Sequence, residues 1–216
     1  MTELYFIRHG ETEWNRSGLW QGHSDSPLTE NGRDQAKALG QRFASENLSF
    51  DAIYTSDLGR AHDTCKLLTA PIDQSDQIQL EPALRERALG HLEGLTFQQI
   101  QDQHPEEARL HAAGDPHFSP ANGGESWADT FARAGAALRT IVRNHPDQRI
   151  LAVSHGGIVG MLLRDCLGLN LLPPRRFQLP NAALNIFRFT DPDWSLQTWG
   201  DTAHLSNVTV LDEVLK

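Results

Sequence analysis

Three segments far apart in the chain each place a cationic or imidazole side chain close behind an apolar run. Arg8 and His9 follow LYFI, Arg60 ends TSDLGR after AIY, and His155 follows ILAV. The planar fork of an arginine matches the oxygens of a phosphate group. A helix that begins directly after His155 would add backbone N–H donors and a partial positive charge. Together these residues predict a site that binds a phosphoryl group.

The apolar runs before these residues are typical of central strands that are covered on both faces. They occupy residues 4–7, 52–54 and 150–153, and segments with helical periodicity lie between them, one with Thr29 as its expected N-cap. Strands that alternate with helices predict an α/β fold, here a three-layer α/β/α sandwich with a mostly parallel central sheet. Ligands bind beyond the carboxyl ends of such strands, so we expect the three segments to meet there.

The remaining segments predict an edge hairpin, a surface loop and a single domain. Residues 184–189 and 194–199 indicate an antiparallel hairpin at one edge of the sheet. The Gly- and Pro-rich stretch at 114–124 (GDPHFSPANGG) indicates a surface loop of the kind that often covers a site. No repeat or linker interrupts the 216 residues, which predicts a single domain over 1–216.

Composition narrows the choice of partners. The formal net charge is −9, from 28 acidic and 19 basic residues, so we expect no binding to nucleic acid or to anionic membranes. No apolar run approaches the roughly 18 residues of a membrane-spanning helix, and no secretion signal is evident. Cys65 and Cys166 lie in stretches with helical periodicity, which predicts two buried thiols and a cytoplasmic location. The oligomeric state stays open, with a homodimer as one alternative.

Five motifs in this order resemble the histidine phosphatase superfamily. The resemblance is greatest to the branch of cofactor-dependent phosphoglycerate mutases and related small phosphatases. The motifs are RHGETEWN (8–15), QGHSDSPLTENG (21–32), YTSDLGRAHDT (54–64), LRERALGHLEGLT (84–96) and VSHGG (153–157), with GGES (123–126) and PNAALN (180–185) as weaker segments. They cover most of the chain, and their number and order make the match specific.

The resemblance implies a role for each residue. His9 would attack phosphorus and become a phosphohistidine, while Arg8, Arg60 and His155 hold the phosphoryl oxygens. Glu86 would protonate the leaving oxygen and then activate water. We expect the charges of Arg8 and Arg60 to lower the pKa of His9, and His155 to be able to carry a charge when substrate is bound. The implied substrate-binding positions are Asn15, Gln21, Gly22 and Gly156, with no cofactor and no metal.

The reaction itself has alternatives. The stretch from Glu86 to His155 is shorter than in cofactor-dependent mutases, which favours hydrolysis of a small phosphate monoester. A phosphoglycerate mutase, a phosphatase of phosphohistidine proteins and a phosphate-binding pseudoenzyme remain alternatives, although all the expected catalytic residues are present. The substrate is not determined. The residues considered for the leaving-group side are His23, Ser24, His117, Phe118 and Glu125.

Two other hydrolase classes are disfavoured. The sequence has no HxH, HExxH or comparable carboxylate–histidine cluster, and the arginines beside the pocket histidines would repel a metal ion. GESWA at 124–128 and HGG at 155–157 resemble parts of a serine hydrolase. However, GESWA ends in Ala and follows a loop, whereas a nucleophile elbow needs a strand before its serine.

Overall fold

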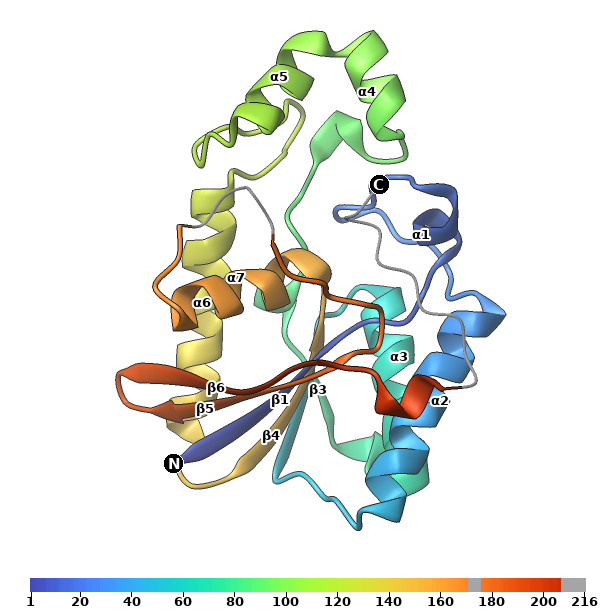
Figure 1. Ribbon diagram of the computed structural model, residues 1–216, viewed down its shortest axis with the longest axis vertical. Helices are drawn as coiled ribbons and strands as arrows, with labels where there is room; N and C mark the ends of the chain where they lie inside the picture. Colours follow the sequence, from blue (N-terminus) through green and yellow to red (C-terminus); the bar gives the residue numbers. More distant parts are fainter. Residues whose placement is uncertain (171–175, 207–216) are drawn as a thin grey trace.

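The computed structural model describes residues 1–170 and 176–206, and a six-stranded sheet lies at its centre (Figure 1). The strand order is β3-β2-β4-β1-β5-β6. The strands are β1 (Thr2–Arg8), β2 (Ala52–Thr55), β3 (Ile78–Leu80), β4 (Arg149–Ser154), β5 (Leu184–Thr190) and β6 (Asp193–Asp201). The first four run parallel, and β5 and β6 add an antiparallel hairpin at one edge. This confirms the predicted mostly parallel sheet with its edge hairpin.

Successive side chains of β1 lie on opposite faces of the sheet. Leu4 and Phe6 pack with α6 (Trp127–Asn144) and α7 (Gly156–Cys166), whereas Tyr5 and Ile7 pack on the opposite side. That side is covered by α2 (Glu30–Ser45) and α3 (Gly59–Thr69). Figure 1 shows the two helix pairs on either side of the strands. Side chains in a strand alternate between the two faces of a sheet, so a strand that is apolar at every position must be covered on both faces. The helices on both faces make the three layers that were predicted.

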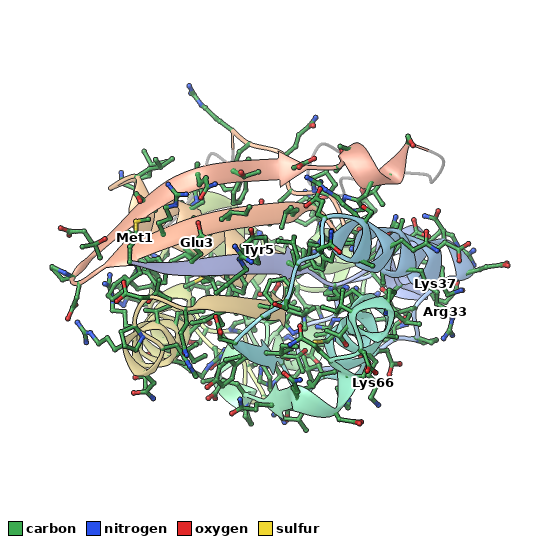
Figure 2. All side chains as sticks on the ribbon, turned by 90° about the horizontal axis from the view of Figure 1, so that it is seen from below. Met1, Glu3, Tyr5, Arg33, Lys37 and Lys66 are labelled. Atoms are coloured by element: carbon green, nitrogen blue, oxygen red, sulfur yellow. The ribbon has the colours of Figure 1, made fainter. Side chains whose placement is uncertain are left out.

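The helix α2 begins and packs as its sequence predicts. The Thr29 side chain accepts a hydrogen bond of 2.9 Å from the backbone N–H of Gly32, which caps the helix. Its buried stripe consists of Ala36, Leu39, Gly40 and Phe43, with Gln35 and Gly32 beside it. Figure 2 shows Arg33, Lys37 and Lys66 on the outer faces of α2 and α3, away from the sheet. The helices thus keep their charges in water while they cover the sheet.

Two short helices stand apart from the sheet at the top of Figure 1, and we call them the lid. They are α4 (Phe97–Gln103) and α5 (Pro105–Ala113), and they follow the 3₁₀ helix η4 (Gly90–Leu92). The lid packs against η4 through a small apolar cluster, built from Leu92 of η4, Ile100 of α4 and Ala108 of α5. The remaining short helices are α1 (Glu13–Ser17), η1 (Ala70–Ile72), η2 (Ser75–Gln77), η3 (Pro82–Leu84) and η5 (Ala203–Leu205).

Several smaller expectations can be compared with the structure. Both cysteines are free, but only Cys65 is fully buried, so the prediction of two buried thiols is wrong for the half-buried Cys166. Residues 114–124 form turns joined by irregular backbone, as expected of a loop. Within the described part of the chain, no helix is both long and apolar enough to cross a bilayer.

Candidate active site

The sheet order explains how three distant segments meet. Strands β2, β4 and β1 are neighbours and parallel, with Arg8 of β1 opposite Ser154 of β4, so their carboxyl ends lie side by side. A cavity of about 380 Å³ opens at this place. The predicted residues that line it are Arg8, His9, Asn15, Gln21, Gly22, Arg60, Glu86 and Gly156. His155 is fully buried behind them, and its ring centre lies 5.2 Å from that of His9.

A backbone contact fixes the state of the His9 ring. Its Nδ1 lies 2.8 Å from the carbonyl oxygen of Gly10, which can only accept a hydrogen bond. Nδ1 therefore carries the proton and Nε2 keeps its lone pair. Gly10 is needed here, because a Cβ at this position would lie 2.5 Å from the carbonyl oxygen of Gly32. The Asn181 side chain donates to the carbonyl oxygen of His9 at 3.0 Å and holds the backbone from the other side.

Both site histidines are held neutral in the free protein. Burial lowers the pKa of His9 well below its usual value, and the charges of Arg60 and Arg8 lower it further. The predicted direction is confirmed, although burial contributes more than the arginines. Burial, followed by Arg60 and His9, likewise lowers the pKa of His155. His155 is therefore neutral in the protein alone, and the charge expected on it when substrate is bound stays a prediction.

Arg60 is a buried cation with a fixed orientation. It is 2% exposed, and it donates to the carbonyl oxygens of Gly22 at 2.7 Å and Ser24 at 2.9 Å and to Asp25 at 3.1 Å. The alternative of an exposed helix cation paired with Asp57 or Asp63 is wrong. Asp57 instead binds Arg85 at 2.7 Å. These bonds direct the guanidinium of Arg60 along the cavity wall.

Two buried nitrogens at the site lack a partner among the described residues. They are Nε of Arg60 and Nδ1 of His155. Nε2 of His155 lies 2.8 Å from the Ser56 hydroxyl, so when Ser56 donates, the ring carries its proton on Nδ1. Buried donors are nearly always satisfied in folded proteins. These two nitrogens, together with the positive charges of Arg8 and Arg60, indicate a place where an oxyanion can bind.

Glu86 is held at the cavity by two backbone N–H groups. One carboxylate oxygen accepts from Arg87 at 2.9 Å and the other from Gly157 at 2.8 Å. A Cβ on Gly157 would lie 2.2 Å from Glu86 Oε1, so a glycine is required for this approach. The alternative of a surface carboxylate bridging to the side chain of Arg85 or Arg87 is therefore wrong.

Two residues that sequence reasoning missed brace the cavity loops. Arg133 of α6 donates to the carbonyl oxygens of Ala83 at 2.8 Å and Arg85 at 3.1 Å, directly before Glu86. Glu93 accepts from the backbone N–H groups of His23 and Ser24, each at 2.8 Å. The first contact holds the loop that carries the carboxylate, and the second holds the loop that binds Arg60.

The leaving-group side of the cavity differs from the expectation. His23, Ser24, His117, Phe118 and Glu125 do not line it; Glu125, for example, binds Arg133 at 2.8 Å. Aromatic and apolar side chains take this place. They are Leu19, Trp20, Leu89, Trp127, Met161 and Phe177, joined by His111, Arg87 and Arg164. A signal that the sequence offered for this wall was the position of Trp20 directly before Gln21.

Comparison with known proteins agrees with this geometry. The model of the histidine phosphatase superfamily (branch 1) matches residues 4–202. Phosphoglycerate mutase-like protein 4 of Arabidopsis thaliana is 33% identical over 212 residues, covering 97% of this chain and 89% of the relative. The metal-independent phosphoserine phosphatase of the same plant is 32% identical over 211 residues, covering 98% and 86%. The solved structure of Bacillus stearothermophilus YhfR has a TM-score of 0.84 at 33% identity, covering 95% of this chain and all of that one. This chain belongs to the histidine phosphatase superfamily, branch 1.

Proposed function

We propose that this protein hydrolyses small phosphate monoesters through a phosphohistidine on His9, without a metal ion. The observation that carries the proposal is the state of His9. Its Nδ1–H is bound to Gly10, its pKa is lowered by burial and by Arg60 and Arg8, and its ring lines a cavity with Glu86. A neutral imidazole with a free lone pair, between two cations and a carboxyl group, is suited to in-line attack on phosphorus.

The first step of the proposed reaction forms a bond and breaks one. Nε2 of His9 attacks phosphorus, and the bond from phosphorus to the ester oxygen breaks. Glu86, in its protonated form, gives its proton to the leaving alcohol. Arg8, Arg60 and the Nδ1–H of His155 stabilise the negative charge on the phosphoryl oxygens. Asn15, Gln21 and the backbone at Gly22 and Gly156 are proposed to position the same group.

The second step returns the enzyme to its starting state. The carboxylate of Glu86 takes a proton from a water molecule, whose oxygen attacks the phosphohistidine. The bond from nitrogen to phosphorus breaks, inorganic phosphate leaves, and His9 is again neutral. Glu86 has thereby regained the proton that it gave to the alcohol, so the cycle is balanced.

Hydrolysis of a small ester is favoured over the alternatives by the shape of the site. The cavity of about 380 Å³ is at the small end of ligand pockets. Its walls beyond the phosphate are mostly apolar, with Arg87 and Arg164 as the cations there that the carboxylate of a phosphoglycerate would need. Relatives carry both phosphatase and mutase names, so the mutase remains the second candidate. We also propose a single domain over 1–216 and a cytoplasmic location, and we leave the homodimer open.

The test is phosphate release in excess chelator from p-nitrophenyl phosphate, phosphoserine, the phosphoglycerates and several sugar phosphates. His9→Ala is compared with the native protein and with His117→Ala, which removes an exposed histidine. We expect turnover in the native protein and in His117→Ala, and none in His9→Ala. An acid-labile phosphate label on the native protein and on His117→Ala, but not on His9→Ala, after incubation with radiolabelled substrate would identify the phosphohistidine. Faster interconversion of 2- and 3-phosphoglycerate than phosphate release would establish the mutase instead, and phosphate binding without turnover would establish the pseudoenzyme.

A further inference from the structure

The lid and η4 bring two imidazoles and one carboxylate together. His91 lies on η4, His104 lies between α4 and α5, and Glu107 lies on α5. One ligand atom from each lies within 4.8 Å of the others, and within the described ranges no other trio of histidine, cysteine or acidic residues does so. The sequence shows no carboxylate–histidine metal motif, yet the fold brings such a group of residues together. The reason is that η4 supplies one histidine from outside the lid helices.

Two of the three ligand-to-ligand distances, those to Glu107, are close to those of a tetrahedral metal site, and the two histidine nitrogens lie within 4.8 Å of each other. His91 Nε2 lies 2.7 Å from Glu107 Oε2, and His104 Nδ1 lies 3.8 Å from the same oxygen. Nitrogen and oxygen ligands bonded at about 2.0–2.1 Å to one tetrahedral zinc ion lie roughly 3.3 Å apart. Each distance thus needs a change of only about half an ångström. All three side chains are half-buried, which leaves an approach for the ion and for a water ligand.

Neighbouring backbone groups orient two of the three ligands. The carbonyl oxygen of Ala121 lies 3.2 Å from Nδ1 of His91, and the N–H of Ala121 donates to Glu107 Oε1 at 3.4 Å. Both ring nitrogens of His91 therefore face oxygens. The ring satisfies both either with two protons, or with one proton on Nδ1 and a metal ion on Nε2. A second hydrogen bond of this kind is typical of histidines that bind metals.

We propose that His91, His104 and Glu107 bind a Zn²⁺ ion, with water as a fourth ligand, and that the ion fastens the lid over the cavity. Imidazole and carboxylate ligands suit zinc. The cavity wall includes Leu89, next to η4, and His111 on α5, whose ring centre lies 4.7 Å from that of Trp20. An ion that joins η4 to α5 holds these two parts of the wall together. None of its three ligands lines the cavity, so this ion would take no part in the chemistry at His9.

The test is calorimetric titration of chelator-treated, dialysed protein with ZnCl₂. We expect one equivalent to bind, with an affinity at least about tenfold weaker in His104→Ala and in Glu107→Gln. The second variant keeps an amide oxygen for the N–H of Ala121 and so preserves the local fold. His117→Ala, on the neighbouring loop, is the matched control and should bind as the native protein does. Circular dichroism checks that each variant is folded.

Trypsin reports whether the ion fastens the lid. Arg109 is exposed on α5, and Lys37 is exposed on α2. We expect one equivalent of Zn²⁺ to slow cleavage after Arg109 several-fold in the native protein and in His117→Ala, but not in His104→Ala. Cleavage after Lys37 should not change. No zinc binding by the folded native protein, or equal affinity in the variants, overturns the site. Loss of binding in the variants with zinc-independent cleavage after Arg109 overturns its role in the lid.

Discussion

Replacing Gly157 with alanine should damage catalysis without damaging the fold. The added Cβ would lie 2.2 Å from Glu86 Oε1 and 3.0 Å from its carboxyl carbon. These atoms are the end of a flexible side chain, so the carboxylate can move away while the backbone stays in place. Gly157 is in the first turn of α7, where alanine is favoured over glycine by up to about 1 kcal/mol. The free energy of unfolding should therefore not fall.

The size of the catalytic effect follows from the displacement. To reach an ordinary contact distance, Glu86 Oε1 must move by roughly 1 Å, and a misplacement of this size costs about 10²-fold in rate. A hundredfold loss corresponds to about 2.7 kcal/mol of transition-state stabilisation. The loss should be largest for alkyl phosphates, whose alcohols need a proton to leave. It should be small for p-nitrophenyl phosphate, whose leaving group needs little help.

The assay is kcat and KM for both ester types, together with thermal melts. Gly135→Ala is the matched control, because it is the same change inside α6 and its Cβ would meet nothing within 4 Å. The control should keep the native kcat for both esters. An equal loss of kcat for both esters in Gly157→Ala would contradict the acid role of Glu86. An unchanged kcat for alkyl phosphates would refute the argument that this glycine makes room for the carboxylate.

Three further perturbations follow from the site. Arg133→Met should lower kcat about tenfold and should also lower the melting temperature, because the carbonyl oxygens of Ala83 and Arg85 lose their donor. An unchanged kcat in a folded variant would argue against a positioning role. Glu93→Gln should raise KM more than it lowers kcat. The two oxygens of Glu93 accept from the backbone N–H groups of His23, Ser24 and Leu89, and an amide keeps only one accepting oxygen. Steady-state kinetics measures kcat and KM, and an unchanged KM would contradict this prediction. Stability should fall as pH drops below about 6.5, by up to about 1.36 kcal/mol per pH unit for each of His9 and His155, because burial lowers their pKa and only the unfolded chain takes up the protons. Urea unfolding at pH 7.5 and 5.5 measures this slope, and equal stabilities would refute it.

The parts of the fold that sequence could predict are those with local signals. The runs that became β1, β2 and β4 are apolar at every position because both faces are covered, and Thr29 caps α2 through its own side chain. Strand β3 has no such signal, because Ile78–Leu80 is a short edge strand with little burial. The lid helices were also missed, since α4 and α5 bury few residues each.

The same distinction applies to the site. Arg8, His9, Arg60 and His155 could be predicted because parallel strands align their carboxyl ends, so that local position becomes spatial proximity. Arg133, Glu93 and Asn181 act on backbone groups of other segments. Nothing near these residues in the sequence marks those partners. The same holds for the apolar wall, whose members come from several loops and helices.

The position of β4 between β1 and β2 has a consequence for biosynthesis. The ribosome makes β1 and β2 early, yet they are not paired with each other, and the strand that joins them comes only at Arg149–Ser154. A nascent chain that ends before β4 cannot bring His9 and Arg60 together, and it lacks His155 altogether. Such non-local pairing is slow relative to local helix formation. The onset of catalysis during translation or refolding therefore requires the insertion of this one strand, and enzymatic activity reports when β4 has joined β1 and β2.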